Sequence, residues 1–380
     1  MVSSKPQPPS HSKVLVLGAG NFGSCLASHL GDSQHDVWVW ARELEIVKHF
    51  NEHHRNPVYL PTHDFPKNIT AIGPGLPDKE FMDSMDVLLF AIPTQFLRRN
   101  LECIRPKLDL NNLPLLIFVN KGIEVGTHAL TLEIIVDTCG PEIAKAATFI
   151  SGPSFAKEIV ERQPTSVSVA SFTEDEASKA ATLFHQPHFR CYTGFDPIGI
   201  ELSGALKNVY AIASGMADGL GFLNNTRAMI ITRGLAEMTC IGTAYGASPL
   251  TFLGLSGVGD LFLTCSSSNS RNYTVGYRLG QGEPLEQIMK TLGSVAEGVS
   301  TTEAVKTVID ELGINAPIAQ AVYEVLYKGK EAKTAVRELM ELPASRELQL
   351  PPTAGGPAQR LLSKLGMDSS TLHEIMHPRL

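Results

Sequence analysis

The sequence predicts an α/β N-terminal domain followed by an all-α C-terminal domain. A short apolar run at 14–17 opens directly into a glycine-rich turn. Segments rich in strand-forming residues and helix-like segments then alternate as far as residue 194, which is typical of a doubly wound sheet. Beyond that point apolar residues recur at helical spacing, and few segments favour a strand.

The first domain is expected to contain a largely parallel sheet. Its first strand, at 14–17, is a continuous apolar run, as expected for a parallel strand buried on both faces. Further strands are expected at 36–40, 87–92, 115–119, 148–150, 166–170 and 189–193. Helix-like stretches lie between them, for example at 22–30, 129–138 and 174–184.

The second domain shows long helix-period segments and ends in a tail. The helices are expected at 198–213, 227–245, 302–312 and 318–328. We therefore expect a polar N-terminal tail at 1–12, a dinucleotide-binding domain at 13–194, a helical domain at 195–342 and a C-terminal tail at 343–380. Proline and glycine pairs interrupt the C-terminal tail, in which one loose helix is expected at 359–365.

Composition restricts the class of function. Hydrophobic residues make up 43% and charged residues 19% of the chain, so a large core can form. A net charge of −7 argues against broad nucleic-acid binding but allows a local basic pocket for a phosphorylated metabolite. The twelve histidines and six scattered cysteines show no metal-ligand spacing, so no metal is expected. No apolar run has the roughly 18 residues of a membrane span.

The sequence favours a cytoplasmic location. Cysteines scattered through a chain of this length are typical of reduced thiols in an intracellular protein. The last three residues, Pro378, Arg379 and Leu380, loosely match the peroxisomal address Ser-Lys-Leu, but the match is poor and coincidence is the better explanation.

The turn after the first strand carries the spacing GxGxxG. Gly18 would allow the tight turn, Gly20 the approach of a pyrophosphate to the backbone, and Gly23 close packing of helix on strand. The helix N-terminus adds free amides and a partial positive charge. Because the motif follows a strand and opens a helix, it predicts dinucleotide binding and a Rossmann-like domain.

The choice between NAD and NADP stays open. An acidic residue after the second strand would bind the ribose of NAD. This sequence places Arg42 there, which could neutralise the 2′-phosphate of NADP or be an ordinary surface charge. Glu43 or Glu45 could instead turn back toward a ribose.

Two polar stretches follow later strands of the first domain. Lys121 stands at the carboxyl end of the expected strand at 115–119, the edge at which open α/β sheets bind ligands. Gly152 and Ser154 follow the next strand and suit close approach to a ligand, although a plain helix N-cap explains Ser154 almost as well.

Two more polar stretches lie in the helical domain. Lys207 and Asn208 sit in a strongly apolar helix, where a snorkelling lysine is favoured on periodicity alone. Asp260 lies in an apolar, glycine-rich run and needs a partner, because an unpaired buried carboxylate is costly. Arg271 and its neighbours Ser270 and Asn272 offer donors suited to a phosphate.

Together these stretches resemble the NAD(P)-dependent glycerol-3-phosphate dehydrogenases. The resemblance covers residues 13–342 and rests on order and spacing throughout. The matching segments are GAGNFG at 18–23, IPTQF at 92–96, NKG at 120–122, SGPSFA at 151–156, GALKNVYAIASG at 204–215, GLSGVGDLFLTC at 254–265, SRN at 270–272 and VAEG at 295–298.

The resemblance implies a role for each matching position. It implies that Lys207 is the catalytic general acid and base. The implied substrate-binding residues are Lys121, Gly152, Ser154, Asn208, Asp260, Thr264, Ser270, Arg271 and Asn272. The implied cofactor-binding residues are Gly18, Gly20, Asn21, Phe22, Gly23, Arg42, Phe96, Lys121, Ala156, Arg271, Val295 and Glu297. It also implies a homodimer that links glycolysis to glycerolipid synthesis by interconverting glycerol 3-phosphate and dihydroxyacetone phosphate.

The sequence departs from the family pattern at a few positions. Phe22 stands where many bacterial members have Trp. Arg42 resembles the NADP-using bacterial pattern, whereas Gln95 and Phe96 resemble the eukaryotic one, so cofactor preference is undecided.

A lysine that acts as base needs a lowered pKa; burial of Lys207 would lower its pKa and a nearby Asp260 would raise it. Both outcomes are compatible with the sequence.

Two other functions compete with this interpretation. One is a related two-domain dehydrogenase of the β-hydroxyacid or 6-phosphogluconate type. The other is a dinucleotide-binding sensor without turnover, for which the N-terminal glycine-rich loop alone would be enough. The combination of Lys207, Asp260 and Arg271 favours the glycerol phosphate hypothesis over both.

Overall fold

The computed structural model describes residues 11–293, 295–343 and 356–367, in which eight strands form one sheet. The order is β3-β2-β1-β4-β5-β6-β7-β8, and all neighbours are parallel except β6 and β7. The strands are β1 Lys13–Leu17, β2 Asp36–Trp40, β3 Ile69–Ile72, β4 Val87–Phe90, β5 Leu115–Phe118, β6 Ala147–Ser151, β7 Thr165–Ser171 and β8 Phe189–Gly194. The predicted fold class is confirmed; the short edge strand β3 was not predicted.

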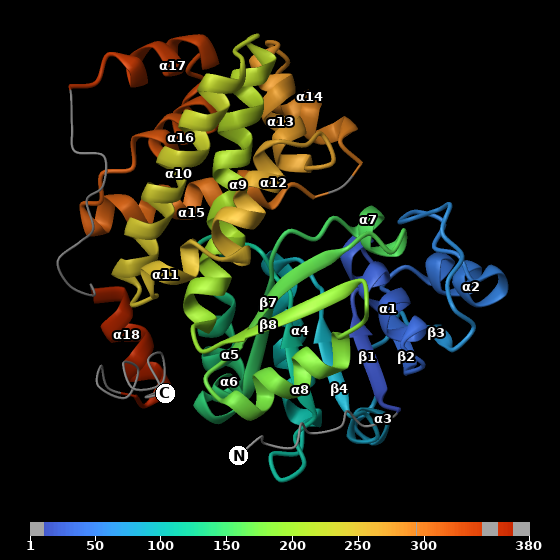
Figure 1. Ribbon diagram of the computed structural model, residues 1–380. Coiled ribbons are helices and arrows are strands. Elements are labelled where there is room, and N and C mark those ends of the chain that lie inside the picture. Colours follow the sequence, from blue (N-terminus) through green and yellow to red (C-terminus); the bar gives the residue numbers. More distant parts are fainter. Residues whose placement is uncertain (1–10, 294, 344–355, 368–380) are drawn as a thin grey trace.

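Helices of the first region cover both faces of this sheet (Figure 1). They are α1 Asn21–Asp32, α2 Leu44–His53, α3 Lys79–Asp83, α4 Thr94–Ile104, the 3₁₀ turn η1 Arg105–Lys107, α5 Thr131–Cys139, α6 Pro141–Ala146, α7 Ala156–Val160 and α8 Glu174–Phe184. After β8 the chain is helical, with α9 Pro197–Gly219, α10 Asn224–Ala244, α11 Pro249–Phe252, the π turn η2 Leu255–Gly259, α12 Asp260–Cys265, α13 Arg271–Gly280, α14 Leu285–Thr291, α15 Glu297–Leu312, α16 Pro317–Lys328, α17 Ala332–Met340 and α18 Gly356–Leu365.

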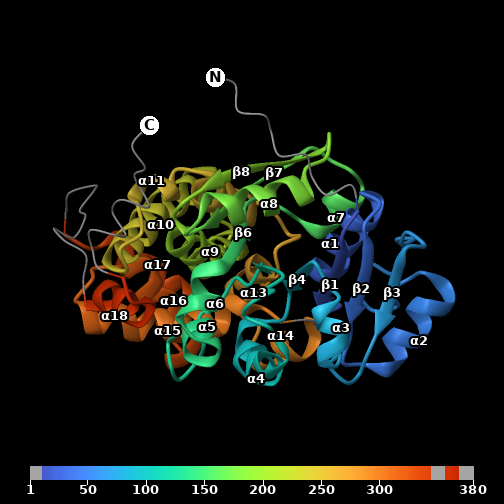
Figure 2. The ribbon, with the colours of Figure 1, turned by 90° about the horizontal axis from the view of Figure 1, so that it is seen from below.

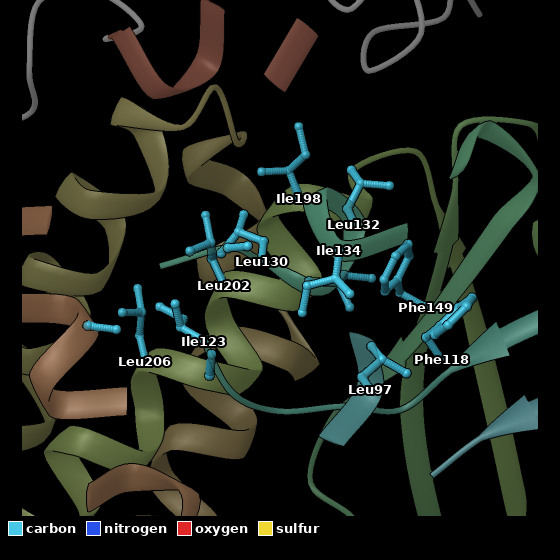
Figure 3. Packing of buried hydrophobic residues seen from close by; sticks show 14 of the residues in the cluster. Leu97, Phe118, Ile123, Leu130, Leu132, Ile134, Phe149, Ile198, Leu202 and Leu206 are labelled. Carbon is cyan, nitrogen blue, oxygen red and sulfur yellow. The ribbon is translucent and has the colours of Figure 1, made fainter. Parts of the chain in front are cut away.

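The alternation of side chains along β1 divides the core into two layers. Val14 and Val16 belong to the cluster under α1, whereas Leu15 and Leu17 belong to the cluster on the opposite face. The second cluster does not stop at the edge of the sheet. In Figure 3 the side chains of Phe118 and Phe149 continue through Leu132 and Leu130 to Leu202 and Leu206 of α9.

Helix α9 connects the sheet region with the helical region. It begins directly after its N-cap residue Asp196, whose side chain accepts a hydrogen bond from Gly199 N at 2.8 Å, and Pro197 occupies the first turn. Almost all of its 23 residues are buried, because it packs against β6 and β7 as well as α10, α13 and α15. The domain boundary at 194/195 stays a prediction, because the sheet region and the helical region share one hydrophobic core.

Helix α18 packs firmly, unlike the loose tail helix that the sequence suggests. Ala358, Leu361, Leu362 and Leu365 are buried, and the three leucines join the core cluster beside α5, α6 and α10. Figure 2 shows α18 at the same end of the molecule as α5 and α6. Residues 1–10 of the N-terminal tail and the Pro-Arg-Leu end at 378–380 lie outside the described residues. Among the described residues, no helix is both long and apolar enough to span a membrane.

Candidate dinucleotide and substrate site

A pocket of about 420 Å³ lies between the carboxyl ends of the central strands and the helical region. Its walls come from the turns after β1, β4, β5 and β6 and from α9, α12 and α13. The sequence-predicted residues that line it are Gly20, Asn21, Phe22, Gly23, Lys121, Ser154, Ala156, Lys207, Asn208, Thr264, Ser270, Arg271, Asn272, Val295 and Glu297. Residues up to 277 positions apart thus meet at the edge where doubly wound sheets bind ligands.

The glycine-rich turn between β1 and α1 has the geometry of a phosphate cradle. Gly18 has φ +121°, and a Cβ there would come within 2.7 Å of Ala91 O. A Cβ on Gly23 would lie 1.9 Å from Gly18 O. Gly20, at the N-cap of α1, has nothing within 4 Å on its open side. The residues therefore fit a dinucleotide, because free amides of α1 face open space that a pyrophosphate can enter.

A buried carboxylate joins two lysines at the inner end of the pocket. Lys207 Nζ donates to Asp260 Oδ1 at 2.6 Å and to Thr264 Oγ1 at 2.8 Å. Lys121 Nζ donates to the other oxygen, Oδ2, at 2.8 Å. Lys207 is only 6% exposed, so it does not snorkel to solvent as periodicity alone suggested. Asp260, which lies just behind the pocket lining, has the partners that its burial requires.

Burial and charge act in opposite directions on this trio. Burial lowers the pKa of Lys207 to about 8, with Asp260 opposing and Lys121 reinforcing the effect. Burial alone would raise the pKa of the Asp260 carboxyl, but the two neighbouring ammonium groups hold it below its ordinary value. Asp260 is therefore an anion, and Lys207 is an ammonium that can lose its proton near neutral pH.

The first turn of α13 forms the opposite wall. Ser270 is the N-cap and accepts from Tyr273 N at 3.2 Å. Arg271 lines the pocket, and burial lowers the pKa of its guanidinium. The Asn272 side chain accepts from Gly298 N at 2.9 Å, which holds the turn against the start of α15. A helix N-terminus combined with a guanidinium is suited to a phosphate.

Residues around the β5 and β6 turns complete the inner wall. Asn208 Nδ2 donates to Lys121 O at 3.0 Å and so fixes the turn after β5 against α9. Gly152, behind the lining, accepts from Lys121 Nζ at 3.3 Å and from Ser154 Oγ at 2.8 Å. The alternative role of Ser154 as a helix N-cap is not seen, because α7 begins at Ala156 and Phe155 takes that position.

Glu297 joins the two regions across the pocket. Its side chain accepts from Thr94 N, at the start of α4, at 3.1 Å, and burial raises its pKa. On the same side, Lys121 Nζ lies 5.6 Å from the ring centroid of Phe22. The second contact puts the predicted cofactor residue Phe22 beside Lys121, and a Cβ on the neighbouring Gly122 would lie 3.4 Å from Glu297 Oε1.

Three predicted cofactor residues lie outside the pocket lining, namely Gly18 in the glycine-rich turn, Arg42 and Phe96. Arg42 follows β2, and its Nη2 lies 2.7 Å from Glu43 Oε1 in an exposed ion pair. Phe96, on α4, is 51% exposed. Arg42 and Phe96 stand on the elements that flank the glycine-rich turn, but the structure does not bring them into the cluster around Lys207.

The prediction missed several lining residues. Ile92, Pro93 and Asn120 line the pocket directly after β4 and β5, and the Asn120 amide donates to Ile92 O. Their position after two buried strands is a pattern that could have identified them. Leu60 also lines the pocket, but it lies in an irregular segment with no distinguishing pattern. Among the described residues, no group of three or more His, Cys, Asp or Glu is placed to hold a metal ion.

Comparison with known proteins agrees with this geometry. Residues 13–177 match the family model of the NAD-dependent glycerol-3-phosphate dehydrogenase N-terminus, and residues 196–337 match that of its C-terminus. The chain is 42% identical over 330 residues to glycerol-3-phosphate dehydrogenase [NAD(P)+] of Limosilactobacillus reuteri, covering 87% of this chain and 97% of that protein. The counterpart in Geobacillus kaustophilus is 43% identical, with 86% and 94% covered.

Solved structures show the same similarity. Glycerol-3-phosphate dehydrogenase from Coxiella burnetii superposes with a TM-score of 0.81 at 31% identity, covering 88% of this chain and 100% of that one. D-mandelate dehydrogenase, at 14% identity and a TM-score of 0.56, shares the fold alone. Two family models match most of the chain, and relatives are about 40% identical to it over most of its length. The chain therefore belongs to the NAD-dependent glycerol-3-phosphate dehydrogenase family.

Proposed function

We propose that this protein is an NAD(P)-dependent oxidoreductase that interconverts sn-glycerol 3-phosphate and dihydroxyacetone phosphate. The observation that carries the proposal is the pairing of Lys207 Nζ with Asp260 Oδ1 at 2.6 Å, in the same pocket as the glycine-rich turn and Arg271. A proton donor, an anion-binding corner and a dinucleotide cradle are the three elements that reduction of a phosphorylated ketone requires.

The dinucleotide is held by the N-terminal region in this proposal. The α1 amides around Gly20 and Asn21 bind the pyrophosphate, and Phe22, Ala156 and Glu297 surround the rest of the cofactor. When bound, the reduced nicotinamide supplies a hydride. If the Arg42 guanidinium separates from Glu43, it can bind the 2′-phosphate of NADP. If the ion pair stays intact, the site suits NAD, which has no such phosphate. The proposal therefore includes both cofactors.

The substrate is held between α13 and the lysine pair. Arg271, with Ser270, Asn272 and the first amides of α13, binds the phosphate. The Lys207 ammonium then faces the carbonyl oxygen of the substrate, where negative charge develops during reduction. It stabilises that charge and donates its proton; in the reverse direction it accepts the proton of the alcohol. Asp260 and Thr264 orient its ammonium, and Lys121 adds positive charge.

Absorbance at 340 nm in the presence of dihydroxyacetone phosphate tests this function directly. We expect oxidation of NADH or NADPH, and the ratio of the two kcat/KM values decides cofactor preference. Binding of cofactor without turnover would instead support a dinucleotide sensor. Turnover with a β-hydroxyacid or with 6-phosphogluconate, and none with dihydroxyacetone phosphate, would support the other dehydrogenase class.

Replacement of the proposed proton donor should remove nearly all turnover and spare cofactor binding. We expect Lys207→Ala to lower kcat by about 10²- to 10⁴-fold, the usual contribution of general acid–base catalysis, and to leave the Kd for the cofactor unchanged. Stopped-flow or steady-state rates together with fluorescence titration of NADH measure both. Near-normal turnover would remove Lys207 from the mechanism.

Replacement of the proposed phosphate ligand should weaken substrate binding. Arg271→Ala removes charge-assisted hydrogen bonds of about 1.5–3 kcal/mol, so we expect KM to rise by roughly 10- to 150-fold. Lys290→Ala is the control, because Lys290 is an exposed cation on α14 that pairs with Glu286. A KM that stays unchanged in Arg271→Ala contradicts the phosphate role.

We further propose a cytoplasmic homodimer. The proposal rests on the family resemblance and on the cysteine pattern of the sequence. Light scattering after size-exclusion chromatography measures the mass in solution, and microscopy of the chain with a fluorescent protein at its N-terminus reports the compartment.

A further inference from the structure

Helices α9 and α13 touch through glycines along their whole crossing. A Cβ on Gly215 would lie 2.1 Å from Tyr273 O, and one on Gly276 would lie 2.0 Å from Ile212 O. One turn further on, Gly219 and Gly280 approach each other in the same way. The two backbones are therefore in direct contact. Because α9 carries Lys207 and α13 begins with Arg271, this glycine seam sets the distance between the two halves of the proposed substrate site.

The glycine seam sets how closely the two backbones approach. A polar contact beside the seam links the two helices a second time. The Tyr273 hydroxyl donates to Asp218 Oδ2 in the last turn of α9, and Arg227 Nη2 at the start of α10 donates to the same oxygen. Asp218 has only 9% of its side chain exposed, so this contact is largely shielded from water.

Tyr273 stands two residues after Arg271 in the first turn of α13. Two residues correspond to about 200° around a helix, so the two side chains leave α13 in nearly opposite directions. Arg271 faces the pocket, and Tyr273 faces the ends of α9 and α10. Any rotation of this turn about its axis moves both side chains together. Holding the tyrosine hydroxyl therefore holds the direction in which the guanidinium points.

We propose that Tyr273, anchored by Asp218 and Arg227, is a positioning residue that aims Arg271 and the α13 amides at the substrate phosphate. The proposal rests on the function proposed above, in which Arg271 binds that phosphate. It adds a residue that touches neither substrate nor cofactor but determines how well a phosphorylated substrate is recognised.

Tyr273→Phe tests the proposal with the smallest change. It removes the hydroxyl, keeps the ring that stacks on Tyr277 with centroids 6.4 Å apart, and leaves Asp218 paired with Arg227. We expect the KM for dihydroxyacetone phosphate, and the inhibition constant of inorganic phosphate, to rise about tenfold while kcat changes less than twofold. The kcat/KM for dihydroxyacetone, which has no phosphate, should stay the same.

Tyr277→Phe is the matched control. It removes the same atom one turn later on the same helix, where the hydroxyl accepts from Gln281 Nε2 at 3.2 Å. We expect its KM for dihydroxyacetone phosphate to match that of the unmodified protein. A Tyr273→Phe protein with a lower melting temperature but an unchanged KM would reduce Tyr273 to a structural role and overturn the proposal. If Tyr273→Phe lowered kcat/KM for dihydroxyacetone as much as for dihydroxyacetone phosphate, the proposal would be overturned too.

A double-mutant cycle separates this inference from the proposed function. If Tyr273 acts through Arg271, then Tyr273→Phe should change KM less than twofold when Arg271 is already alanine. A further tenfold rise in that background overturns the inference. If Arg271→Ala raises KM and Tyr273→Phe does not, only the inference fails. If Arg271→Ala itself has no effect, the phosphate role in the proposed function fails, and the inference with it.

Discussion

Lys207 shows how one side chain can be both buried and ready to exchange a proton. Its ammonium has two protein acceptors, Asp260 Oδ1 and Thr264 Oγ1, and it lies in a helix with almost no exposed surface. The sequence left two opposing effects undecided, burial against the attraction of Asp260. In the structure burial is the largest effect, and Lys121, which pairs with the other oxygen of Asp260, also lowers the pKa of Lys207, which falls to about 8.

This value predicts opposite pH dependences for the two directions of the reaction. Ketone reduction needs the Lys207 ammonium, so its rate should decrease as pH rises through about 8. Alcohol oxidation needs the neutral amine, so its rate should increase over the same interval. Initial rates in both directions between about pH 6.5 and 9.5 measure this. Two flat profiles, or two profiles that change in the same direction, would contradict proton transfer by Lys207.

At the scale of single elements, α9 organises most of the site. It carries Lys207 and Asn208 toward the pocket, Asp218 toward α13 and Glu201 toward the sheet region. The Glu201 carboxylate accepts from the backbone N–H groups of Thr131 and Leu132 at the start of α5. A side chain of the helical region thus satisfies amides that α5 cannot satisfy within its own helix.

Removal of this contact should destabilise the protein. Glu201→Ala leaves two buried backbone N–H groups without an acceptor and opens a cavity, which should cost about 2–4 kcal/mol. Glu201→Gln retains one carbonyl acceptor and should cost less. Differential scanning calorimetry should therefore order the melting temperatures as unmodified, then Glu201→Gln, then Glu201→Ala. Equal melting temperatures for all three proteins would show that α5 does not depend on this carboxylate.

The sequence predicted elements with strong local patterns and missed those that depend on distant contacts. The apolar run of β1 and the spacing of Gly18, Gly20 and Gly23 identify a strand, a turn and a helix within a dozen residues. The short edge strand β3 has no continuous apolar run and was not predicted. The pairing of Lys207 with Asp260 spans 53 residues, and that of Lys121 with Asp260 spans 139, so only the fold could reveal them.

At the scale of the whole molecule, the core extends from the sheet into the helical region. The cluster that begins at Leu15 and Leu17 includes residues of α9, α10, α15 and α16, and it also takes in α18. Helix α18 lies beyond residue 337, where the match to the family models ends. It contacts α5 and α6 of the sheet region as well as α10 of the helical region. Helix α18 therefore adds apolar contacts between the sheet region and the helical region, and it does not line the pocket.

The stability of the whole chain should depend on the apolar face of α18 and little on its charges. Leu361 is fully buried, and Leu→Ala at such a site costs about 2–5 kcal/mol, which corresponds to a fall of several degrees in Tm. Lys364 pairs with Asp137 at 2.8 Å on the surface, and an exposed pair contributes only about 0–1 kcal/mol. We therefore expect Leu361→Ala to lower Tm by about 2–6 °C and Lys364→Ala by about 1 °C or less. Both proteins should keep the KM for dihydroxyacetone phosphate, because α18 does not line the pocket. Equal melting temperatures for the two variants would show that α18 is held to the molecule by its surface charge and not by the shared core.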